Sequence, residues 1–517
     1  MADRFNTLKV VCDEGMIQNL DSLTLGEAHM GAAERLVNFE GDINGGYKRI
    51  KGYSLYSSSA VPLSGTDTNA VVLGVAVYGS GVVAARGENI FYSSISAGVV
   101  QPWVAINSSA YPLSEKYRFT HYQWTTSNMI LTNGVSWALR LSGTSLTELS
   151  ASGAPTNPKY SEEFHNHIFY AGYSSNTRAV KFCVPNTDTD FSASNGAGEI
   201  VIGDDVVGLK KYRDELIIFG LHTIHKITGD SIFNFKLENI TDNIGCIASD
   251  SIQEFNTELI FLAPDGLRTI ASTDKIGDTE LAVLSKEIQP FTQTVIDAYI
   301  NSGMFSSVVV RAKSQYRLFV AKAGVAAAAT PGIIGSFTKG TPASGIEWGE
   351  LLGFQSYCAH SQYIGKDEYV IHGDRDGYVY RQENTNSFNG ANVTSIYKTP
   401  HITFGDPTIR KTLYKLNTYH RMDGLANIAV GTSMDYGDTT RIQPPNFAIT
   451  SSTFAAIYGV STVLYGTAIY GVQNSYIGNT NIVSSGYTAQ FTFTTTDTNP
   501  PYSINAFVIQ YGVNGRR

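Results

Sequence analysis

Short hydrophobic runs separated by glycine or polar turns recur along the first 400 residues. Each unit contains a run of alternating apolar residues, a turn and a second short run, a pattern typical of a β-hairpin. Residues 129–137 are the clearest example, because Asn133 and Gly134 give a strong hairpin-turn signal. Seven such units begin at residues 81, 129, 167, 215, 258, 316 and 368.

The spacing of these units predicts a β-propeller. Their starting positions lie 38 to 58 residues apart, and a four-stranded propeller blade uses about 40–50 residues. The longer intervals are explained by residues 321–345, which are rich in Ala, Gly, Thr and Pro and are expected to form a projecting loop inserted in the sixth unit. We therefore predict an all-β fold with a seven-bladed β-propeller over residues 56–400.

The hydrophobic pattern changes near residue 400. Residues 408–419 alternate as one long strand, and residues 491–494 and 506–512 indicate two more. Three Tyr-Gly pairs between residues 458 and 471 are each expected to place an aromatic ring on one face of a sheet. We interpret residues 401–517 as a separate antiparallel β-sandwich.

Residues 1–55 are expected to form an extended N-terminal arm and the first strands. Residues 1–40 lack a strong periodicity, so this part is expected to pack against another domain or subunit. Convincing helical patterns are few. A short amphipathic helix over residues 281–288 and a turn or two at residues 297–300 are expected, and under about a tenth of the chain should be helical.

Composition supports a folded β protein. Hydrophobic residues make up 43% of the chain, which is enough to form a core, and Gly (49) and Tyr (30) are abundant. The net charge of −8 argues against a strongly basic nucleic-acid binder. No apolar segment follows the first residues, so no signal peptide is expected. The longest apolar run, residues 71–85, is too short to cross a membrane and is interpreted as a hairpin.

The cysteines are expected to be buried free thiols. They are scattered widely and no Cys-x-x-Cys pair occurs, so their spacing supports neither a zinc site nor a disulfide framework. Free thiols are typical of proteins made in a reducing cytoplasm. The four residues are Cys12, Cys183, Cys246 and Cys358.

Two histidine pairs are candidate metal ligands. His165 and His167 are expected to share one face of a strand, and His222 and His225 lie on another strand. A metal site needs three or four converging ligands, and neither pair has a cysteine or acidic partner at motif spacing. We therefore expect no metal and no cofactor.

Acidic residues give the remaining candidates. Residues 374–377 (Asp-Arg-Asp-Gly) lack the further ligands of an EF-hand and are interpreted as a β-turn with glycine at its positive-φ position. No Gly-x-Ser-x-Gly elbow and no Walker loop occurs. Four carboxylates would suit a glycosidase pair at a propeller mouth, but charged turns between blades give the same pattern, so no catalytic residue is assigned and no enzymatic activity is expected. They are Asp204, Asp205, Asp214 and Glu215.

An ordered set of segments runs from one end of the chain to the other. Near the N-terminus, an Asn38-Phe39 strand leads to a Gly-rich turn that ends in Lys51-Gly52-Tyr53. In their order these segments resemble virion proteins of the bacteriophage tail-hub or tail-nozzle kind, whose best-known relatives are the packaged-DNA-stabilisation proteins of short-tailed phages. The segments are residues 15–19, 32–39, 45–53, 212–220, 372–380 and 511–517.

The resemblance implies a structural subunit of a phage tail, present in the virion and assembled in the cytoplasm of the bacterial host. Members of this family form rings below the portal and adaptor, where DNA leaves the head. The resemblance therefore implies that six copies of this chain form a closed homo-oligomeric ring. The implied partners are the portal-adaptor, other tail proteins, tail fibres and double-stranded DNA in transient passage, without membrane insertion. The loop at residues 321–345 would then contact a neighbouring subunit or line the conduit.

The composition agrees with this interpretation. An acidic conduit would repel DNA phosphates and let DNA slide, and tyrosines suit subunit interfaces because the ring packs while the hydroxyl stays hydrogen-bonded. Two other classes stay open from the sequence. One is a propeller-based tail adhesin or lectin that binds host-surface glycans, and the other is a propeller glycosidase.

Overall fold

Short strands make up most of the molecule. Strands account for 52% of the chain and helices for 8%, which confirms the predicted all-β class and the low helix content. The strands form many small antiparallel sheets. The computed structural model describes residues 5–63, 71–107, 111, 115–255, 257–270, 283–338, 345–440, 443–450 and 476–514.

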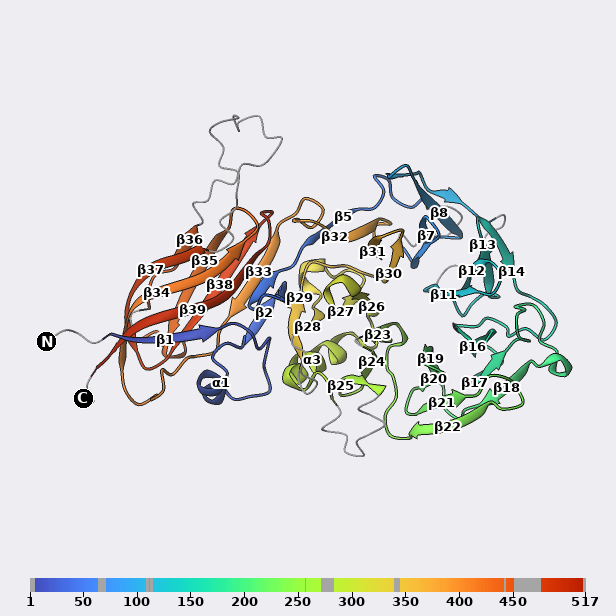
Figure 1. The fold of residues 1–517 in the computed structure, drawn as a ribbon, viewed down its shortest axis with the longest axis horizontal. Helices are drawn as coiled ribbons and strands as arrows, with labels where there is room; N and C mark the ends of the chain where they lie inside the picture. Colours follow the sequence, from blue (N-terminus) through green and yellow to red (C-terminus); the bar gives the residue numbers. More distant parts are fainter. Residues whose placement is uncertain are drawn as a thin grey trace.

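Each of the seven predicted units contains the second strand, in chain order, of an antiparallel run of strands. Six of these runs are separate small sheets, and the sixth in chain order, β26-β27-β28-β29, is the first part of a nine-stranded sheet and is called the sixth small sheet below. The small sheets follow one another around a common centre (Figure 1). The apolar run at residues 71–85 forms the predicted hairpin, in which Tyr78 pairs with Gly81. The second strands are β7 (Gly81–Arg86), β12 (Ser127–Thr132), β16 (His167–Tyr173), β20 (Glu215–Gly220), β24 (Glu258–Ala263), β27 (Gln315–Ala321) and β31 (Asp367–Gly373).

The first strands of these sheets lie nearest the common centre, and the later strands lie outward. The first strands are β6 (Gly74–Tyr78), β11 (Arg118–Gln123), β15 (Tyr160–Phe164), β19 (Val206–Tyr212), β23 (Gln253–Phe255), β26 (Met304–Val310) and β30 (Cys358–Ile364). The outer strands are β8 (Asn89–Ser96), β9 (Val99–Val100), β10 (Val104–Ala105), β13 (Leu139–Ser142), β14 (Ser145–Glu148), β17 (Asn176–Phe182), β18 (Gly198–Val201), β21 (Ile224–Thr228), β22 (Lys236–Thr241), β25 (Gly266–Thr269), β28 (Gly332–Phe337), β29 (Ile346–Leu351) and β32 (Val379–Thr385).

An N-terminal strand completes the last small sheet. β5 (Gly52–Leu55) pairs antiparallel with β32, which gives the order β30-β31-β32-β5. Tyr53 anchors this strand, because its ring stacks on Phe388 with 4.9 Å between centroids and its hydroxyl donates to the carbonyl of Gly353 at 2.8 Å. Segments more than 300 residues apart in sequence are therefore joined here.

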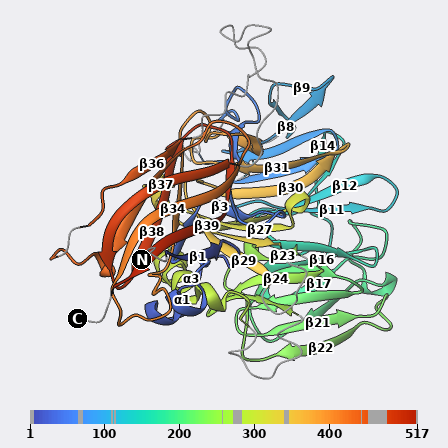
Figure 2. The same ribbon diagram turned by 60° about the vertical axis from the view of Figure 1, so that its left-hand side comes forward.

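Two larger sheets contain the C-terminal strands. One has the order β3-β4-β39-β34-β37, with β1 also paired to β39. The other continues the sixth small sheet through β29-β2-β33-β38-β35-β36. Figure 2 shows these strands beside the stack of small sheets. The strands are β1 (Asn6–Val11), β2 (Arg35–Val37), β3 (Phe39–Gly41), β4 (Tyr47–Arg49), β33 (Val393–Lys398), β34 (Lys411–Met422), β35 (Asn427–Met434), β36 (Phe447–Thr450), β37 (Tyr476–Gly486), β38 (Ala489–Asp497) and β39 (Tyr502–Val513).

The largest apolar core lies between these two sheets and extends toward the sixth small sheet. Phe507 of β39 and Leu416 of β34 share it with Phe493 of β38 and Val430 of β35, and Trp348 of β29 belongs to the same cluster. Alternate residues of each strand supply it, as expected when one face of a sheet is buried.

The sheets do not follow the predicted boundaries at residues 55 and 400. Before residue 55, β3 and β4 pair with each other and with β39, and β2 lies between β29 and β33. Before residue 400, β33 pairs with β38. The two halves of the molecule are therefore joined through shared hydrogen-bonded sheets rather than through a single linker.

The expected extended course of residues 1–40 is wrong for their described part, whereas the expected packing against a distant part of the protein is seen where β1 pairs with β39. Residues 5–40 include β1, the helix α1 (Ser22–Ala28), β2 and part of β3. Ala32, Ala33 and Phe39 are fully buried. These residues are a component of the fold of their own chain, because their apolar side chains enter its core.

The expected helix and the expected loop are also corrected. Of the helix expected at residues 281–288, the described part contains a 3₁₀ turn at Lys286–Ile288, and the α-helix α3 follows at Gln289–Tyr299, where it buries Val295 and Ile296 along one face. α3 includes most of the helical turn expected at residues 297–300. Within residues 321–345, β28 is a buried strand that contributes Ile333 and Ile334 to the interior, so only its flanks are open to form a loop. The Tyr-Gly pairs between residues 458 and 471 and part of this loop, residues 339–344, lie outside the described residues.

Candidate functional site

A polar cavity lies where the first strands of the small sheets meet. Its volume is about 350 Å³, and residues from β6, β11, β15, β19, β26 and β30 line it together with residues 249–253. Hydroxyl groups join neighbouring walls, since Thr120 donates to the carbonyl of Ser161 at 2.7 Å and Ser306 donates to that of Ser356 at 3.0 Å. The charged lining residues are Lys116, Arg118, Lys210, Arg311, Glu162 and Asp250.

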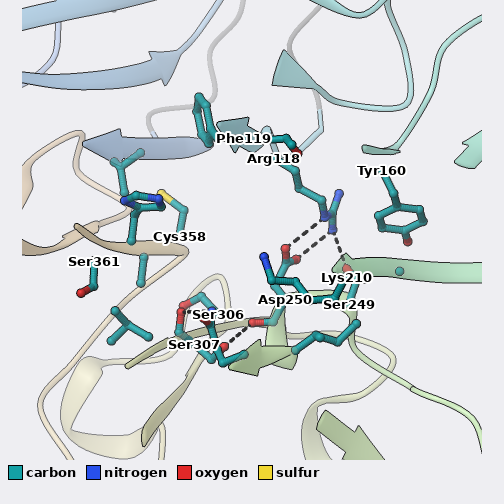
Figure 3. A pocket seen from close by; sticks show the side chains of 18 of the residues that line it. Arg118, Phe119, Tyr160, Lys210, Ser249, Asp250, Ser306, Ser307, Cys358 and Ser361 are labelled. Carbon is teal, nitrogen blue, oxygen red and sulfur yellow. Dashed lines mark hydrogen bonds and ion pairs between the residues drawn. The ribbon is translucent and has the colours of Figure 1, made fainter. Parts of the chain in front are cut away.

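Asp250 is the main anion of the cavity. Arg118 donates to both of its carboxylate oxygens, at 3.0 and 2.8 Å (Figure 3). The ammonium of Lys116 lies 3.2 Å from the same carboxylate. The hydroxyl of Ser307 donates to its backbone carbonyl at 2.6 Å. Burial disfavours the charged carboxylate, but Arg118 and Lys116 outweigh this effect and lower the pKa of Asp250 to about 2. Asp250 is therefore a permanent anion that ties β11 to the segment before β23.

Two further cations face the cavity with weaker or more distant partners. The ammonium of Lys210 lies 3.4 Å from Glu162. The guanidinium of Arg311 donates to the hydroxyl of Ser361 at 2.9 Å and lies 3.8 Å from Glu368. Four cations and two carboxylates thus line the cavity wall, and Glu368, next to the lining, pairs with Arg311 and balances its charge.

Two histidines lie side by side at the same wall. The ring centroids of His121 and His360 are 5.6 Å apart. Burial, and then the positive charge of Lys210, lower the pKa of His121 to about 4. Burial is also the largest cause that lowers the pKa of His360, to about 3. A general acid or base works best with a pKa near the operating pH, and neither histidine meets this condition at neutral pH.

The histidine pairs considered from the sequence do not form sites. His165 lies in the turn between β15 and β16 with φ 46°, so it does not share a strand face with His167, whose Nδ1 lies 2.6 Å from the carbonyl of Cys183. His222 is exposed and close to Asp204, whereas His225 is buried in β21. Among the described residues, no group of three His, Cys, Asp or Glu side chains is placed to hold a metal ion.

The four carboxylates considered from the sequence lie at opposite ends of β19, outside the cavity lining. Burial opposes ionisation of Asp204, but N–H groups, including that of His222 at 2.7 Å in the connection between β20 and β21, outweigh burial and lower its pKa. Glu215 pairs with Lys226 at 2.9 Å. Asp204 therefore stabilises a turn, and Glu215 forms a surface ion pair.

The turn at residues 374–377 is confirmed as a glycine turn. Gly377 has φ 89°, and the carboxylate of Asp374 accepts the N–H groups of Asp376 and Tyr378 at 3.0 and 2.8 Å. The guanidinium of Arg86 packs directly against Gly377, so a larger residue would clash there.

All four cysteines are free and buried, as predicted. Burial raises the pKa of each thiol to about 12. Because the thiolate is the reactive form, we expect a thiol reagent such as Ellman's reagent to label the native protein about 100-fold or more slowly than a free thiol. Four thiols should react once urea unfolds the chain. Rapid labelling of any cysteine in the native protein would contradict this assignment.

Sequence reasoning missed the cavity residues. Arg118 and Asp250 are 132 positions apart, and neither belongs to a motif. Lys116 and Arg118 lie two residues apart, just before and at the start of β11, and this pair of basic residues was the local signal available.

Comparisons with known proteins do not supply a family. No protein-family description and no curated protein matches the chain. A computationally designed protein, Ika8, aligns with this chain at 11% identity and a TM-score of 0.34. The alignment covers 63% of this chain and 99% of Ika8. The extracellular domain of a putative one component system from Bacteroides thetaiotaomicron aligns at 9% identity and a TM-score of 0.39. The alignment covers 71% of this chain and 43% of that protein.

A quinonprotein alcohol dehydrogenase-like protein from the same organism aligns at 9% identity and a TM-score of 0.34. The alignment covers 55% of this chain and 67% of that protein. Likenesses at this level carry no argument about function. Within the described ranges, the helices are too short or too polar to cross a membrane.

Proposed function

We propose that this chain is a non-enzymatic structural subunit of a bacteriophage tail that assembles into a closed homo-oligomeric ring, a hexamer. In this proposal the ring is a hub or nozzle below the portal-adaptor, where it retains and conducts the genomic DNA. The ordered segments that resemble the tail-hub family are the basis of the proposal.

The proposal includes an architecture. The small sheets would be the seven blades of a β-propeller, and the two C-terminal sheets would be a β-sandwich. In support, the first strands surround one cavity, and β5 completes the last small sheet with a strand from the start of the chain. The C-terminal sheets share one apolar core, as the layers of a sandwich do.

The observation that carries the functional proposal is the position of the residues that resemble the family. The amide of Asn38 donates to the carbonyls of Leu352 and Thr394 at 3.1 and 2.8 Å. The hydroxyl of Tyr47 donates to the carbonyl of Gly31 at 2.8 Å and accepts the N–H of Gly15 at 2.9 Å. Asn38 thus joins the N-terminal segment to residues more than 300 positions away, and Tyr47 fixes the N-terminal segment itself, which favours a shared architectural role over a shared catalytic one.

A row of apolar side chains offers a surface for contact between subunits. Val11, Ala506, Tyr419 and Ile477 are aligned across β1, β39, β34 and β37 and face away from the core. Val11, Tyr419 and Ile477 are 43%, 39% and 51% exposed. Contiguous exposed apolar surface is typical of protein–protein contacts, and in a ring the occupant would be a second copy of this chain.

Sedimentation velocity of the purified full-length chain tests the proposal. We expect a closed ring of identical copies, and we expect Tyr419→Lys to raise the concentration needed for assembly at least about tenfold, because a charge would be buried at the contact. Tyr363→Lys, at an exposed tyrosine on β30, is the matched control and should leave the ring intact.

A wild-type chain that stays monomeric, alone and with its adaptor partner, would contradict the ring. If that monomer also bound glycans of the host surface, the adhesin hypothesis would replace the present one.

A further inference from the structure

We infer that copies of this chain bind one another by strand addition, with β37 of one copy pairing with β1 of the next. The two strands are opposite edges of one sheet, in which the order is β1-β39-β34-β37 (Figure 1). Among the described residues, β37 pairs only with β34, and β1 pairs only with β39. The inference rests on the proposed ring, for which it names the two surfaces that meet.

β37 is a long edge strand without charges to prevent pairing. Sheet edges are ordinarily protected by charged residues, by proline or by short length. β37 has 11 residues and contains no charged residue and no proline. In contrast, the outer strand β18 contains Glu199, and the outer strand β22 contains Lys236 and Glu238. The open side of β37 therefore offers backbone N–H and C=O groups to a strand of another chain.

The strand directions let the next copy continue the sheet in the same orientation. Each of the four strands is antiparallel to its neighbour in the order β1-β39-β34-β37. A copy added beyond β37 in the same orientation therefore places its β1 antiparallel to β37, and the alternation continues across the contact. The contact joins two different surfaces, and contacts of this kind close into a ring when the rotation between copies allows it.

The exposed apolar side chains of the two edges have the same spacing. Phe5, directly before β1, lies six positions from Val11, and Ile477 lies six positions from Val483. All four are exposed, Phe5 by 54% and Val483 by 84%. An antiparallel register that places Val11 of the next copy opposite Ile477 also places its Phe5 opposite Val483. Cross-strand apolar pairs of this kind stabilise a sheet.

These side chains lie on the outer side of the sheet. More and less exposed residues alternate from Ile477 to Val483, although the pairing with β34 shifts register after Asn481. The ring of Phe5 lies against the exposed Tyr414 of β34, with 4.9 Å between centroids. In this register the apolar row that ends at Ile477 in one copy continues with Val11 of the next copy.

Formation of a disulfide between copies tests the contact. In this register Thr7 of one copy lies opposite Asn481 of the next, and both are exposed. Opposed residues of an antiparallel pair have Cα atoms about 4.5–5.5 Å apart, which suits a disulfide. Full-length Thr7→Cys and Asn481→Cys chains, mixed at low concentration, concentrated and oxidised, should cross-link to each other. Neither variant alone should cross-link. The four native cysteines are buried and do not compete.

A second measurement uses a charge at the edge. Val483→Lys should raise the concentration needed for assembly at least about tenfold, because a charge would be buried at the contact. Val201→Lys is the matched control, since Val201 is an exposed valine on the edge strand β18 of a small sheet, and it should leave assembly unchanged. Both valines are exposed, so neither substitution should affect folding of the single chain.

The outcomes separate this contact from the proposed ring. A ring that forms without the mixed cross-link would overturn strand addition and leave the ring standing. Cross-linking of Asn481→Cys with itself would also overturn it, because two copies of β37 would then pair with each other. The mixed cross-link in an open series of copies would support strand addition and contradict the closed ring. Monomers without any cross-link would overturn both.

Discussion

Removing residues 1–40 is expected to abolish the cooperative unfolding transition of the whole chain. β2 lies inside the nine-stranded sheet, where it pairs with β33 on one side and β29 on the other. Its loss leaves the hydrogen-bonding groups of both neighbours unpaired and removes the buried side chains of Leu36, Val37 and Phe39. The combined loss exceeds the roughly 5–15 kcal/mol that stabilises a typical domain.

A graded truncation separates this effect from simple shortening. Removing residues 1–11 takes away only β1, an edge strand that pairs with β39 on one side, so the shorter chain should fold with reduced stability. Circular dichroism and urea unfolding of the two truncated chains measure the difference. A soluble chain lacking residues 1–40 that unfolds at the wild-type urea concentration would restore the hypothesis of a detachable arm.

Glu383→Gln is expected to destabilise the protein by about 3–5 kcal/mol, because it leaves the fully buried Arg317 and the partly buried Lys313 with one carboxylate. Glu383 pairs with Arg317, which is fully buried, and with Lys313 at 2.6 Å. Lys313 also lies 2.6 Å from Glu40 of β3. This network links the sixth and seventh small sheets to an N-terminal strand, so its loss is expected to weaken the contacts among these three parts of the fold.

The interaction of Glu383 with Arg317 and Lys313 makes the free energy of unfolding depend on pH, in a direction that the lowered pKa of Glu383 determines. Burial opposes the charge of Glu383, but Arg317 and Lys313 outweigh it and hold the pKa of this carboxyl well below its ordinary value of 4.5. Its contribution is therefore complete above pH 4.5 and is lost as the pH falls through the lowered pKa. The difference in unfolding free energy between wild type and Glu383→Gln should shrink below pH 4.5.

Urea unfolding at several pH values measures both effects. Glu163→Gln is the matched control, since Glu163 pairs with Lys211 near the surface and its loss should change stability by less than about 1 kcal/mol. Equal effects of the two substitutions, or a difference that stays constant down to pH 2, would rule out a stabilising role for the buried network.

Local signals in the sequence were sufficient for the repeated hairpins. Asn133 and Gly134 mark the turn after β12, but the connection to β13 runs over residues 133–138 and not over these two residues alone. Gly134 has φ 81°, and the side chain of Asn133 accepts the N–H groups of Val135 and Ser136 at 3.1 and 2.9 Å. The alanine-rich stretch misled the prediction for residues 321–345, because Ile333 and Ile334 form a buried strand that is too short to stand out.

The long-range pairings were beyond such signals. β2 and β5 have three and four residues, and their partners lie more than 300 positions away. The cavity was missed for the same reason, since Arg118, Lys210 and Asp250 come from three separate sheets or connections and each is unremarkable in its own segment. Only the succession of the first strands around one centre brings these charges together.

Electron microscopy of purified virions that carry a labelled copy of this protein tests the central claim most directly. The proposed function predicts that the label forms a ring at the tail, directly below the portal-adaptor on the path of the DNA. Label confined to the tips of tail fibres, or virions that lack the protein and still retain their DNA, would contradict it.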